Sequence, residues 1–514
     1  MAIDAGTGSC RAILFDREGN QVATAQEEWS HRSLPQYPGS QVFDTSTNWE
    51  LISKCVRGAI SRASADPSDV KGVSATSMRE GMVLYDDGGK EIWACPNVDS
   101  RATREAASLI KSGAARKIFR EGGDWVSITA PPRFLWIRKN QPEVFRRIRH
   151  VGMISDWILF RLSGRFVTDP SVGSSSGMFD LMKRAWSERT AGLCGLDSDV
   201  FPEVGEPGSV VGEVTKRAAE ETGLRAGTPV VLGGADTQLG LIGIGASERG
   251  GVTVVGGSFW QTTVALDRPL IDGKMRLRSL CHAIPGKWMM EGIGFYSGLT
   301  LRWFRDGFCQ SEKEEAKRRG VDPYVLMEEL AGRVPAGSNG VMGIFANVMD
   351  SKRWVHASPS LLQFRITDPA NSGKKECIRA IEESAAYVVL GHLGIMESIT
   401  RRKAGTVRFA GGGSKGKVWP QVLADVLGVE VEIPVVKEST SLGCAVCAGT
   451  GTGWYGGLGS GSKELSRTER TLSPDPANHR LYGQLYKKWA RVYARSLDMA
   501  EEGLLEPLWW PAGA

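Results

Sequence analysis

The sequence predicts an α/β protein with two domains. Its 514 residues are enough for two or three cores of ordinary size. Apolar runs typical of strands alternate with segments whose apolar residues recur at helical spacing, which favours an α/β fold over an all-α or all-β one. This pattern starts near residue 2 and starts again after residue 250. We therefore expect an N-terminal domain over 1–240 and a C-terminal domain over 241–514, joined near residues 237–250.

The first half of the chain has the pattern of an antiparallel meander followed by a helix and a strand. Strand-like segments at 2–3, 11–15 and 21–29 are separated by turns at 6–8 and 16–20. Apolar residues at helical spacing predict a helix over 49–63, and a buried strand follows at 70–75. An irregular, mostly helical stretch is expected from 101 to 186. A further strand at 229–232 leads into Gly233-Gly234-Ala235-Asp236.

The second half repeats the alternation. A strand at 252–255 leads into Gly256-Gly257-Ser258, and helices are predicted over 299–308 and 378–395. A strand at 406–410 leads into Gly411-Gly412-Gly413-Ser414. Residues 454–463 are rich in Gly and Ser and predict a surface loop, before a final helix around 482–495.

Charge and composition exclude several classes of protein. Lys and Arg number 63 against 58 Asp and Glu, and the net charge of +5 is too small for the basic stripe of a nucleic-acid-binding protein. No apolar stretch approaches the roughly 20 residues that span a bilayer, and Asp4 argues against a signal peptide. The nine scattered cysteines favour reduced thiols. We expect a soluble, cytoplasmic protein with no nucleic-acid partner and no membrane insertion.

Three short motifs are better explained by packing or chance than by chemistry. The segment Gly411 to Lys417 matches most of a P-loop, but Val418 stands where a hydroxyl should bind Mg²⁺. The same region fits the nucleophile elbow G-x-S-x-G at Ser414, although His479 is the one histidine after it, so a hydrolase stays an alternative. Cys444-Ala445-Val446-Cys447 lacks the second pair that a zinc site needs, and the six histidines never pair at ligand spacing.

Four glycine segments remain: Asp4-Ala5-Gly6-Thr7-Gly8-Ser9, Gly233-Gly234-Ala235-Asp236, Gly256-Gly257-Ser258 and Gly411-Gly412-Gly413-Ser414. Backbone N–H groups and small hydroxyls beside glycine form anion-binding concavities, so we expect these segments to converge on one phosphorylated ligand. Asp4, at the end of the first strand, is placed to hold Mg²⁺ through water. Asp236 is either a cap of the following helix or a general base for an attacking hydroxyl.

With these segments identified, the chain resembles the FGGY carbohydrate kinases over nearly its whole length. The similarity lies in Asp4 to Ser9 with Arg11, in Asp236, in Gly257-Ser258, in Gly411 to Ser414 and in the closing segment Glu438 to Ala445. This family belongs to the actin, hexokinase and Hsp70-like superfamily. The resemblance therefore implies two ribonuclease H-like domains with an active-site cleft between them, ATP as phosphoryl donor and Mg²⁺.

Within the family the chain is most similar to the autoinducer-2 kinases. That likeness is carried by the segments 77–81, 92–99, 153–157, 257–261, 298–306 and 409–417. It implies transfer of the γ-phosphoryl group of ATP to the terminal C5 hydroxyl of linear 4,5-dihydroxypentane-2,3-dione, the open form of the quorum-sensing signal.

The resemblance also assigns roles to individual residues. Asp236 would be the catalytic base. Substrate would be bound by Met78, Arg79, Glu80, Asp236, Thr237, Gln238 and Trp260. ATP would be bound by Thr7, Gly8, Ser9, Arg11, Gly257, Ser258, Gly411, Gly412, Gly413 and Ser414, and the metal by Asp4. Two departures from the family are a short first strand before Asp4, and Ser258 where many members have Thr.

Several alternatives stay open at this point. The acceptor could be another small polyol or ketose, such as a pentulose or a tetritol. A protein of another class, a nucleotide-dependent binding protein of the same fold, would need no base at Asp236. The resemblance also permits a phosphocarrier protein of the sugar uptake system as a partner.

Overall fold

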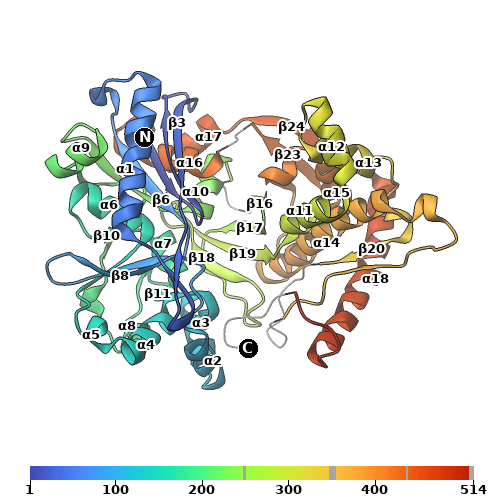
Figure 1. The fold of residues 1–514 in the computed structure, drawn as a ribbon, viewed down its shortest axis with the longest axis horizontal. Helices are drawn as coiled ribbons and strands as arrows, with labels where there is room; N and C mark the ends of the chain where they lie inside the picture. Colours follow the sequence, from blue (N-terminus) through green and yellow to red (C-terminus); the bar gives the residue numbers. More distant parts are fainter. Residues whose placement is uncertain (247–249, 346–354, 436–437, 509–514) are drawn as a thin grey trace.

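The computed structural model describes residues 1–246, 250–345, 355–435 and 438–508. Figure 1 shows two lobes side by side, with the first part of the chain in blue to green on the left and the last part in yellow to red on the right. Each lobe is built on one mixed β-sheet. Among the described helices none is both long and apolar enough to cross a membrane.

The N-terminal sheet has six strands in the order β14-β15-β6-β1-β2-β3. The first three strands form the predicted antiparallel meander, and β6 and β15 extend it in parallel from β1. Their bounds are β1 (Ala2–Ala5), β2 (Ser9–Phe15), β3 (Gln21–Glu28), β6 (Val73–Ser77), β15 (Pro229–Ala235) and the antiparallel edge strand β14 (Val210–Glu213). The apolar pattern therefore located five of these six strands to within a few residues, and β14 was not predicted.

The C-terminal sheet repeats the same pairing pattern. Its order is β18-β19-β17-β16-β22-β23-β24, with an antiparallel meander, two parallel strands and an antiparallel edge strand, and with β18 added at the other edge. The bounds are β16 (Val252–Gly256), β17 (Trp260–Leu266), β18 (Arg278–Cys281), β19 (Trp288–Gly294), β22 (Thr406–Ala410), β23 (Glu430–Pro434) and β24 (Thr468–Leu472).

Amphipathic helices cover the outer face of each sheet. On the N-terminal sheet these are α1 (Thr45–Ala63) and α6 (Ile154–Ser163), and on the C-terminal sheet α14 (Lys374–Thr400), backed by α15 (Val418–Leu427) and α18 (Pro476–Glu501). The helix α1 begins four residues earlier than the apolar pattern suggests, because the Asp44 side chain accepts a hydrogen bond from the Thr47 N–H and caps it. The predicted helices over 49–63, 378–395 and 482–495 are confirmed within α1, α14 and α18.

The remaining elements are insertions around the two sheets. The stretch from 101 to 186 is mostly helical, as predicted, but it also contributes short strands. In the N-terminal lobe the strands are β4 (Arg32–Leu34), β5 (Tyr37–Val42), β7 (Met82–Tyr85), β8 (Glu91–Cys95), β9 (His150–Met153), β10 (Val167–Thr168), β11 (Phe179–Asp180), β12 (Ala185–Trp186) and β13 (Glu203–Val204). Its helices are α2 (Thr103–Lys111), α3 (Ala114–Gly122), α4 (Ala130–Asn140), α5 (Pro142–Arg146), α7 (Pro170–Ser175), α8 (Glu188–Cys194) and α9 (Lys216–Thr222). The C-terminal lobe adds α11 (Ser297–Phe308), α12 (Gln310–Arg319), α13 (Pro323–Ala331), β20 (Met342–Ile344) and β21 (Ser360–Leu362).

Two helices cross between the sheets, and each packs on the sheet of the other lobe. The helix α10 (Asp236–Gly243) follows β15, and its end packs against β18, β19 and β22. The helix α16 (Ser439–Gly451) comes from the C-terminal half, yet it packs on β1, β6 and β15. Figure 1 shows α16, in orange-red, beside the blue and green elements of the N-terminal lobe. The expected boundary near residue 240 thus falls inside a helix that joins the two lobes.

Glycine is required where these helices cross. A Cβ on Gly443 would lie 1.9 Å from the carbonyl oxygen of Leu239, and one on Gly243 would lie 2.0 Å from that of Ser439. Neither carbonyl can rotate away, since each belongs to a helix backbone. The two glycines therefore set the distance between the helices.

Two sequence predictions about glycine-rich segments are wrong. Gly233 and Gly234 lie inside β15 rather than in a loop after it. Glycine is needed at 233 because a Cβ there would lie 2.0 Å from the carbonyl oxygen of Ala75 on the neighbouring strand. The expected surface loop at 454–463 contains α17 (Leu458–Leu465). Leu458 and Leu465 are buried against α16, so tertiary packing overrides the low helix propensity of the glycines.

The variant Gly443→Ala should be strongly destabilised, because overpacking in a rigid core costs about 1–3 kcal/mol and a backbone carbonyl leaves little room to relax. The matched control is Gly394→Ala in α14, where a Cβ would meet no atom within 4 Å. That control should be neutral or more stable by up to about 1 kcal/mol. Urea unfolding of the two variants measures the difference, and equal stabilities would contradict the crossing geometry.

Candidate active site

The carboxyl ends of three neighbouring parallel strands bring predicted site residues of the N-terminal lobe together. In the strand register Ala5 on β1 lies opposite Ser77 on β6, which lies opposite Ala235 on β15. The next residues along the chain are the turn 6–8, the segment 78–80 and Asp236. Ligands of open α/β sheets bind at such strand ends, so this edge is the candidate site.

Asp236 is the first residue of α10 and faces Arg79. Its Oδ1 accepts hydrogen bonds from the N–H (2.6 Å) and the hydroxyl (3.3 Å) of Thr237, and the Nε of Arg79 lies 3.8 Å from the same oxygen. Burial raises the pKa of Asp236 above the ordinary aspartate value, against the opposing effect of Arg79, although 36% of the side chain is exposed. Ala235 occupies the N-cap position, so Asp236 is not the helix cap.

Asp4, Arg11 and Glu438 form a second charged group at the same edge. Arg11 donates from Nη1 to Glu438 at 2.6 Å, and its Nε lies 3.5 Å from Asp4. Burial raises the pKa of Asp4 to about 6, and the negative charges of Asp236 and Glu438 add to the effect of burial while Arg11 opposes it. A buried carboxyl group beside two others is a chemical environment that a divalent cation would stabilise. Within the described ranges no three His, Cys, Asp or Glu side chains are close enough to ligate a metal directly.

Two glycine turns of the C-terminal lobe also lie side by side. Val255 on β16 is opposite Ala410 on β22, so the turn Gly257-Ser258 and the loop Gly411 to Ser414 leave the sheet together. Gly411 has a φ of 90°, and a Cβ there would lie 2.8 Å from the carbonyl oxygen of Gly256. Gly257, Ser258, Gly411 and Gly412 are exposed. Exposed glycine turns of this kind are suited to phosphate, because a ligand can approach their backbone closely.

Three of the predicted substrate-binding residues are packing residues in this structure. Trp260 is 1% exposed and packs between Phe409 and Trp419. Met78 is 2% exposed and lies in the N-terminal core. Gln238 is fully buried, and its Nε2 lies 3.4 Å from the carbonyl oxygen of Cys281. Their contact with a substrate stays a prediction, and in this structure the three side chains contribute to packing. Arg79, Glu80, Asp236 and Thr237 lie together as expected.

The helix N-terminus after the loop Gly411 to Ser414 is occupied by a carboxylate of the protein itself. Glu328 accepts hydrogen bonds from the N–H groups of Lys417 (2.7 Å) and Val418 (2.9 Å), at the start of α15. This arrangement fills the position where a P-loop would bind phosphate. The Ser414 hydroxyl donates to the carbonyl oxygen of Gly411, and the Nδ1 of His479 lies 3.0 Å from the carbonyl oxygen of Asp425. The structure thus gives no support to a hydrolase triad at Ser414.

A network of buried ion pairs joins the two lobes beside Asp236, and the sequence analysis did not predict these pairs. Arg79 donates to Glu291 on β19, with 3.1 Å to each carboxylate oxygen. Arg278 on β18 donates to Glu80 at 2.8 Å and to Asp124 at 2.6 Å. Glu80 has a φ of 65°, a strained conformation for a residue other than glycine. No sequence spacing could have revealed this network, since its ion pairs join residues 154 to 212 positions apart.

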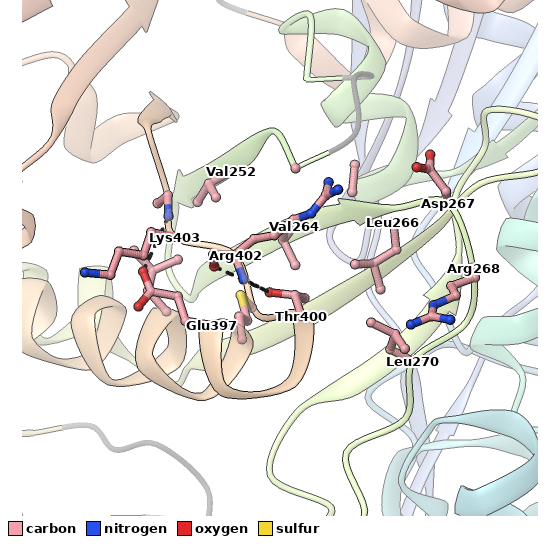
Figure 2. A pocket seen from close by; sticks show the side chains of 15 residues that line it. Val252, Val264, Leu266, Asp267, Arg268, Leu270, Glu397, Thr400, Arg402 and Lys403 are labelled. Carbon is pink, nitrogen blue, oxygen red and sulfur yellow. Dashed lines mark hydrogen bonds between the residues drawn. The ribbon is translucent and has the colours of Figure 1, made fainter.

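A cavity of about 500 Å³ lies at the other end of β16 and β17, away from these groups. Figure 2 shows its apolar floor, with Val252, Val264, Leu266 and Leu270, and charged side chains around it, among them Arg268, Arg402 and Glu397. Its lining contains none of the predicted site residues. Because Val252 begins β16 and Gly257 follows its end, the cavity and the exposed glycine turn lie at opposite ends of one strand.

Comparison with known proteins relates both halves of the chain to one family. The N-terminal domain model of the FGGY family of carbohydrate kinases matches residues 1–243, and its C-terminal domain model matches residues 259–452. The autoinducer-2 kinase of Yersinia enterocolitica is 45% identical, over all of this chain and 97% of that protein. The autoinducer-2 kinase of Klebsiella pneumoniae is 44% identical with the same coverage.

Solved structures confirm the fold. The xylulose kinase from Rhodospirillum rubrum superposes with a TM-score of 0.84 at 25% identity, covering 96% of this chain and 98% of that one. The Plasmodium falciparum glycerol kinase with ADP has a TM-score of 0.83 at 19% identity, covering 96% and 97%. The predicted two-domain α/β fold of the actin and ribonuclease H-like kind is therefore confirmed. With two domain models that together cover most of its length, and relatives similar from end to end, this chain belongs to the FGGY family of carbohydrate kinases.

Proposed function

We propose that this protein transfers the γ-phosphoryl group of ATP to the C5 hydroxyl of linear 4,5-dihydroxypentane-2,3-dione, the open form of autoinducer-2. The similarity of 44–46% over the whole chain to autoinducer-2 kinases carries this proposal. The grouping of Asp236, Arg79 and Glu80 at one strand edge supports it, because alcohol phosphorylation needs a base beside groups that position the acceptor.

Asp236 is the proposed general base. Its carboxylate takes the proton of the C5 hydroxyl as that oxygen forms a bond to the γ-phosphorus, and the bond from this phosphorus to the β–γ bridging oxygen breaks, releasing ADP. The Thr237 contacts hold the Asp236 carboxylate at the start of α10. Arg79 and Glu80 orient the acceptor from the adjacent strand end.

The nucleotide is proposed to lie between the two lobes. Thr7, Gly8, Ser9 and Arg11 would contact its phosphates from the N-terminal lobe, and Gly257, Ser258 and Gly411 to Ser414 from the C-terminal lobe. Phosphoryl transfer depends mainly on such positioning and on stabilising charge around the moving group. Mg²⁺ fits the carboxylate environment of Asp4, which would hold it through water, and when bound it would neutralise phosphate charge.

An acceptor panel tests the proposed substrate. The purified protein is assayed for ADP formation from ATP with the dione, with pentuloses, with tetritols and with no acceptor. We expect kcat/KM to be highest for the dione. A higher value for a pentulose or tetritol would replace the proposed acceptor, and ATP turnover that ignores every acceptor would favour a nucleotide-dependent binding protein instead.

Replacement of the base should remove turnover while leaving nucleotide binding intact. In Asp236→Asn the side chain keeps its size but cannot accept the hydroxyl proton, so kcat should fall by about 10²–10⁴-fold. The dissociation constant for ATP, measured by calorimetry, should stay within about twofold of the wild-type value because no phosphate contact is lost. Near-normal turnover in this variant would rule out Asp236 as the base.

The pH profile should report the raised pKa values. A base acts only when ionised, and burial raises the pKa of both Asp236 and Asp4 above the ordinary 3.8. Activity should therefore fall on the acid side through an apparent pKa that belongs to the pair and lies above 3.8. A kcat/KM that stays constant from neutral pH down to about 4, under conditions where the protein remains folded, would contradict this assignment.

A further inference from the structure

Two charged side chains of the C-terminal lobe reach the acceptor side of the N-terminal lobe. Arg278 on β18 and Glu291 on β19 are directly opposite each other in the antiparallel register, so they project from the same face of the sheet. Their exposed fractions are 1% and 0%, and the Nε of Arg278 lies 3.7 Å from Oε1 of Glu291. Neither residue belongs to a sequence motif that points to catalysis.

Glu291 holds the guanidinium group that lies beside Asp236. The Nη1 of Arg79 donates to both carboxylate oxygens of Glu291 at 3.1 Å, whereas its Nε lies 3.8 Å from Oδ1 of Asp236. Arg79 is thus hydrogen-bonded to a carboxylate of the other lobe and approaches Asp236 without a hydrogen bond. The shorter, doubly accepted contact is the stronger one.

The distance between Arg79 and Asp236 matters for proton transfer. A general base needs an oxygen lone pair directed at the hydroxyl whose proton it accepts. A guanidinium hydrogen-bonded to Asp236 would occupy that oxygen and would stabilise the carboxylate, which weakens it as a base. Without Glu291, Asp236 would be the nearest carboxylate partner for Arg79 among the ion pairs of the described residues.

Folding stability is a poor explanation for this contact. Burying guanidinium and carboxylate groups costs desolvation free energy that their attraction often does not recover. Glu291 and Arg79 also come from different lobes, so their contact exists only when the lobes are together. The contact therefore links the relative position of the lobes to the surroundings of Asp236.

We propose that Glu291 is a positioning residue for phosphoryl transfer. It holds Arg79 away from Asp236, so that the Asp236 carboxylate is available to the acceptor hydroxyl when the lobes are together. The inference rests on the proposed function in one respect, the role of Asp236 as base, and it holds for any acceptor that the protein phosphorylates.

The test is a double-mutant cycle with Glu291→Gln, Arg79→Gln and the double variant, measuring kcat and the KM for ATP. Glu291→Gln should lower kcat about tenfold or more and change the KM for ATP less than about twofold. Because Glu291 acts through Arg79, replacing Glu291 should cause no further loss of kcat when Arg79 is already replaced. A wild-type kcat in Glu291→Gln, or an equal fold-loss in the Arg79→Gln background, would overturn the inference.

The chain offers a matched control in the same sheet. Glu432 on β23 is opposite Arg408 on β22 and forms a cross-strand ion pair at 3.2 Å with both side chains partly exposed, and this pair involves neither Arg79 nor Asp236. Glu432→Gln should leave kcat unchanged, and a loss equal to that of Glu291→Gln would mean that any cross-strand pair of this sheet has the same effect, against the inference.

Two further arms keep the test decisive. Glu291→Asp keeps the negative charge and should retain a higher kcat than Glu291→Gln, so a lower one would count against the inference. Where Glu291→Gln fails to fold by circular dichroism, Glu291→Asp replaces it in the cycle, and its loss of kcat must likewise vanish in the Arg79→Gln background.

If the wild type does not phosphorylate the dione, the cycle uses whichever acceptor the panel identifies. This choice separates failure of the proposed substrate from failure of this inference.

Discussion

The close crossing of α10 and α16 is the constraint on which the site depends. Gly243 and Gly443 allow the two helix backbones to touch, because any side chain there would overlap a carbonyl oxygen of the other helix. Helices that cross at this distance also bring their first turns together. The Thr440 hydroxyl accordingly donates to the backbone carbonyl of Asp236. The candidate base and the segment that carries Glu438 are thus placed by contacts of the helix backbones as well as by charged pairs.

Charge then determines what the site can do chemically. Three buried carboxylates, Glu80, Asp124 and Glu291, share two guanidinium groups, Arg79 and Arg278. Burial raises the pKa of Asp124 to about 6 even though Arg278 opposes the shift. Burial disfavours the charged form of Asp236 and raises its pKa, Arg79 opposes this shift, and the charges of Glu80 and Glu291 add to it, which strengthens Asp236 as a proton acceptor at the pH where it is ionised. The arrangement is consistent with acceptor activation rather than with stabilisation of the fold.

Glycine has three different structural roles in this protein. At Gly233 it allows two strands to approach, at Gly443 it allows two helices to cross, and at Gly257 and Gly411 it forms exposed turns. The sequence alone does not distinguish these roles, because each begins as a glycine after an apolar run. Glu328 is a second example of what the local sequence does not reveal. Its carboxylate, distant in the sequence, binds the N–H groups at the N-terminus of α15, where a P-loop-like segment could otherwise bind phosphate.

The sequence by itself predicted the α/β fold, five strands of the N-terminal sheet, β16 and β22 of the C-terminal sheet, and helices within α1, α11, α14 and α18, because these follow from local apolar periodicity. Only the tertiary structure decided that Trp260 and Gln238 are buried, that 458–465 is helical and that Glu291 binds Arg79 across 212 positions of the chain. The reason is physical: contacts between distant side chains depend on how the two lobes pack, and the local sequence does not contain that packing.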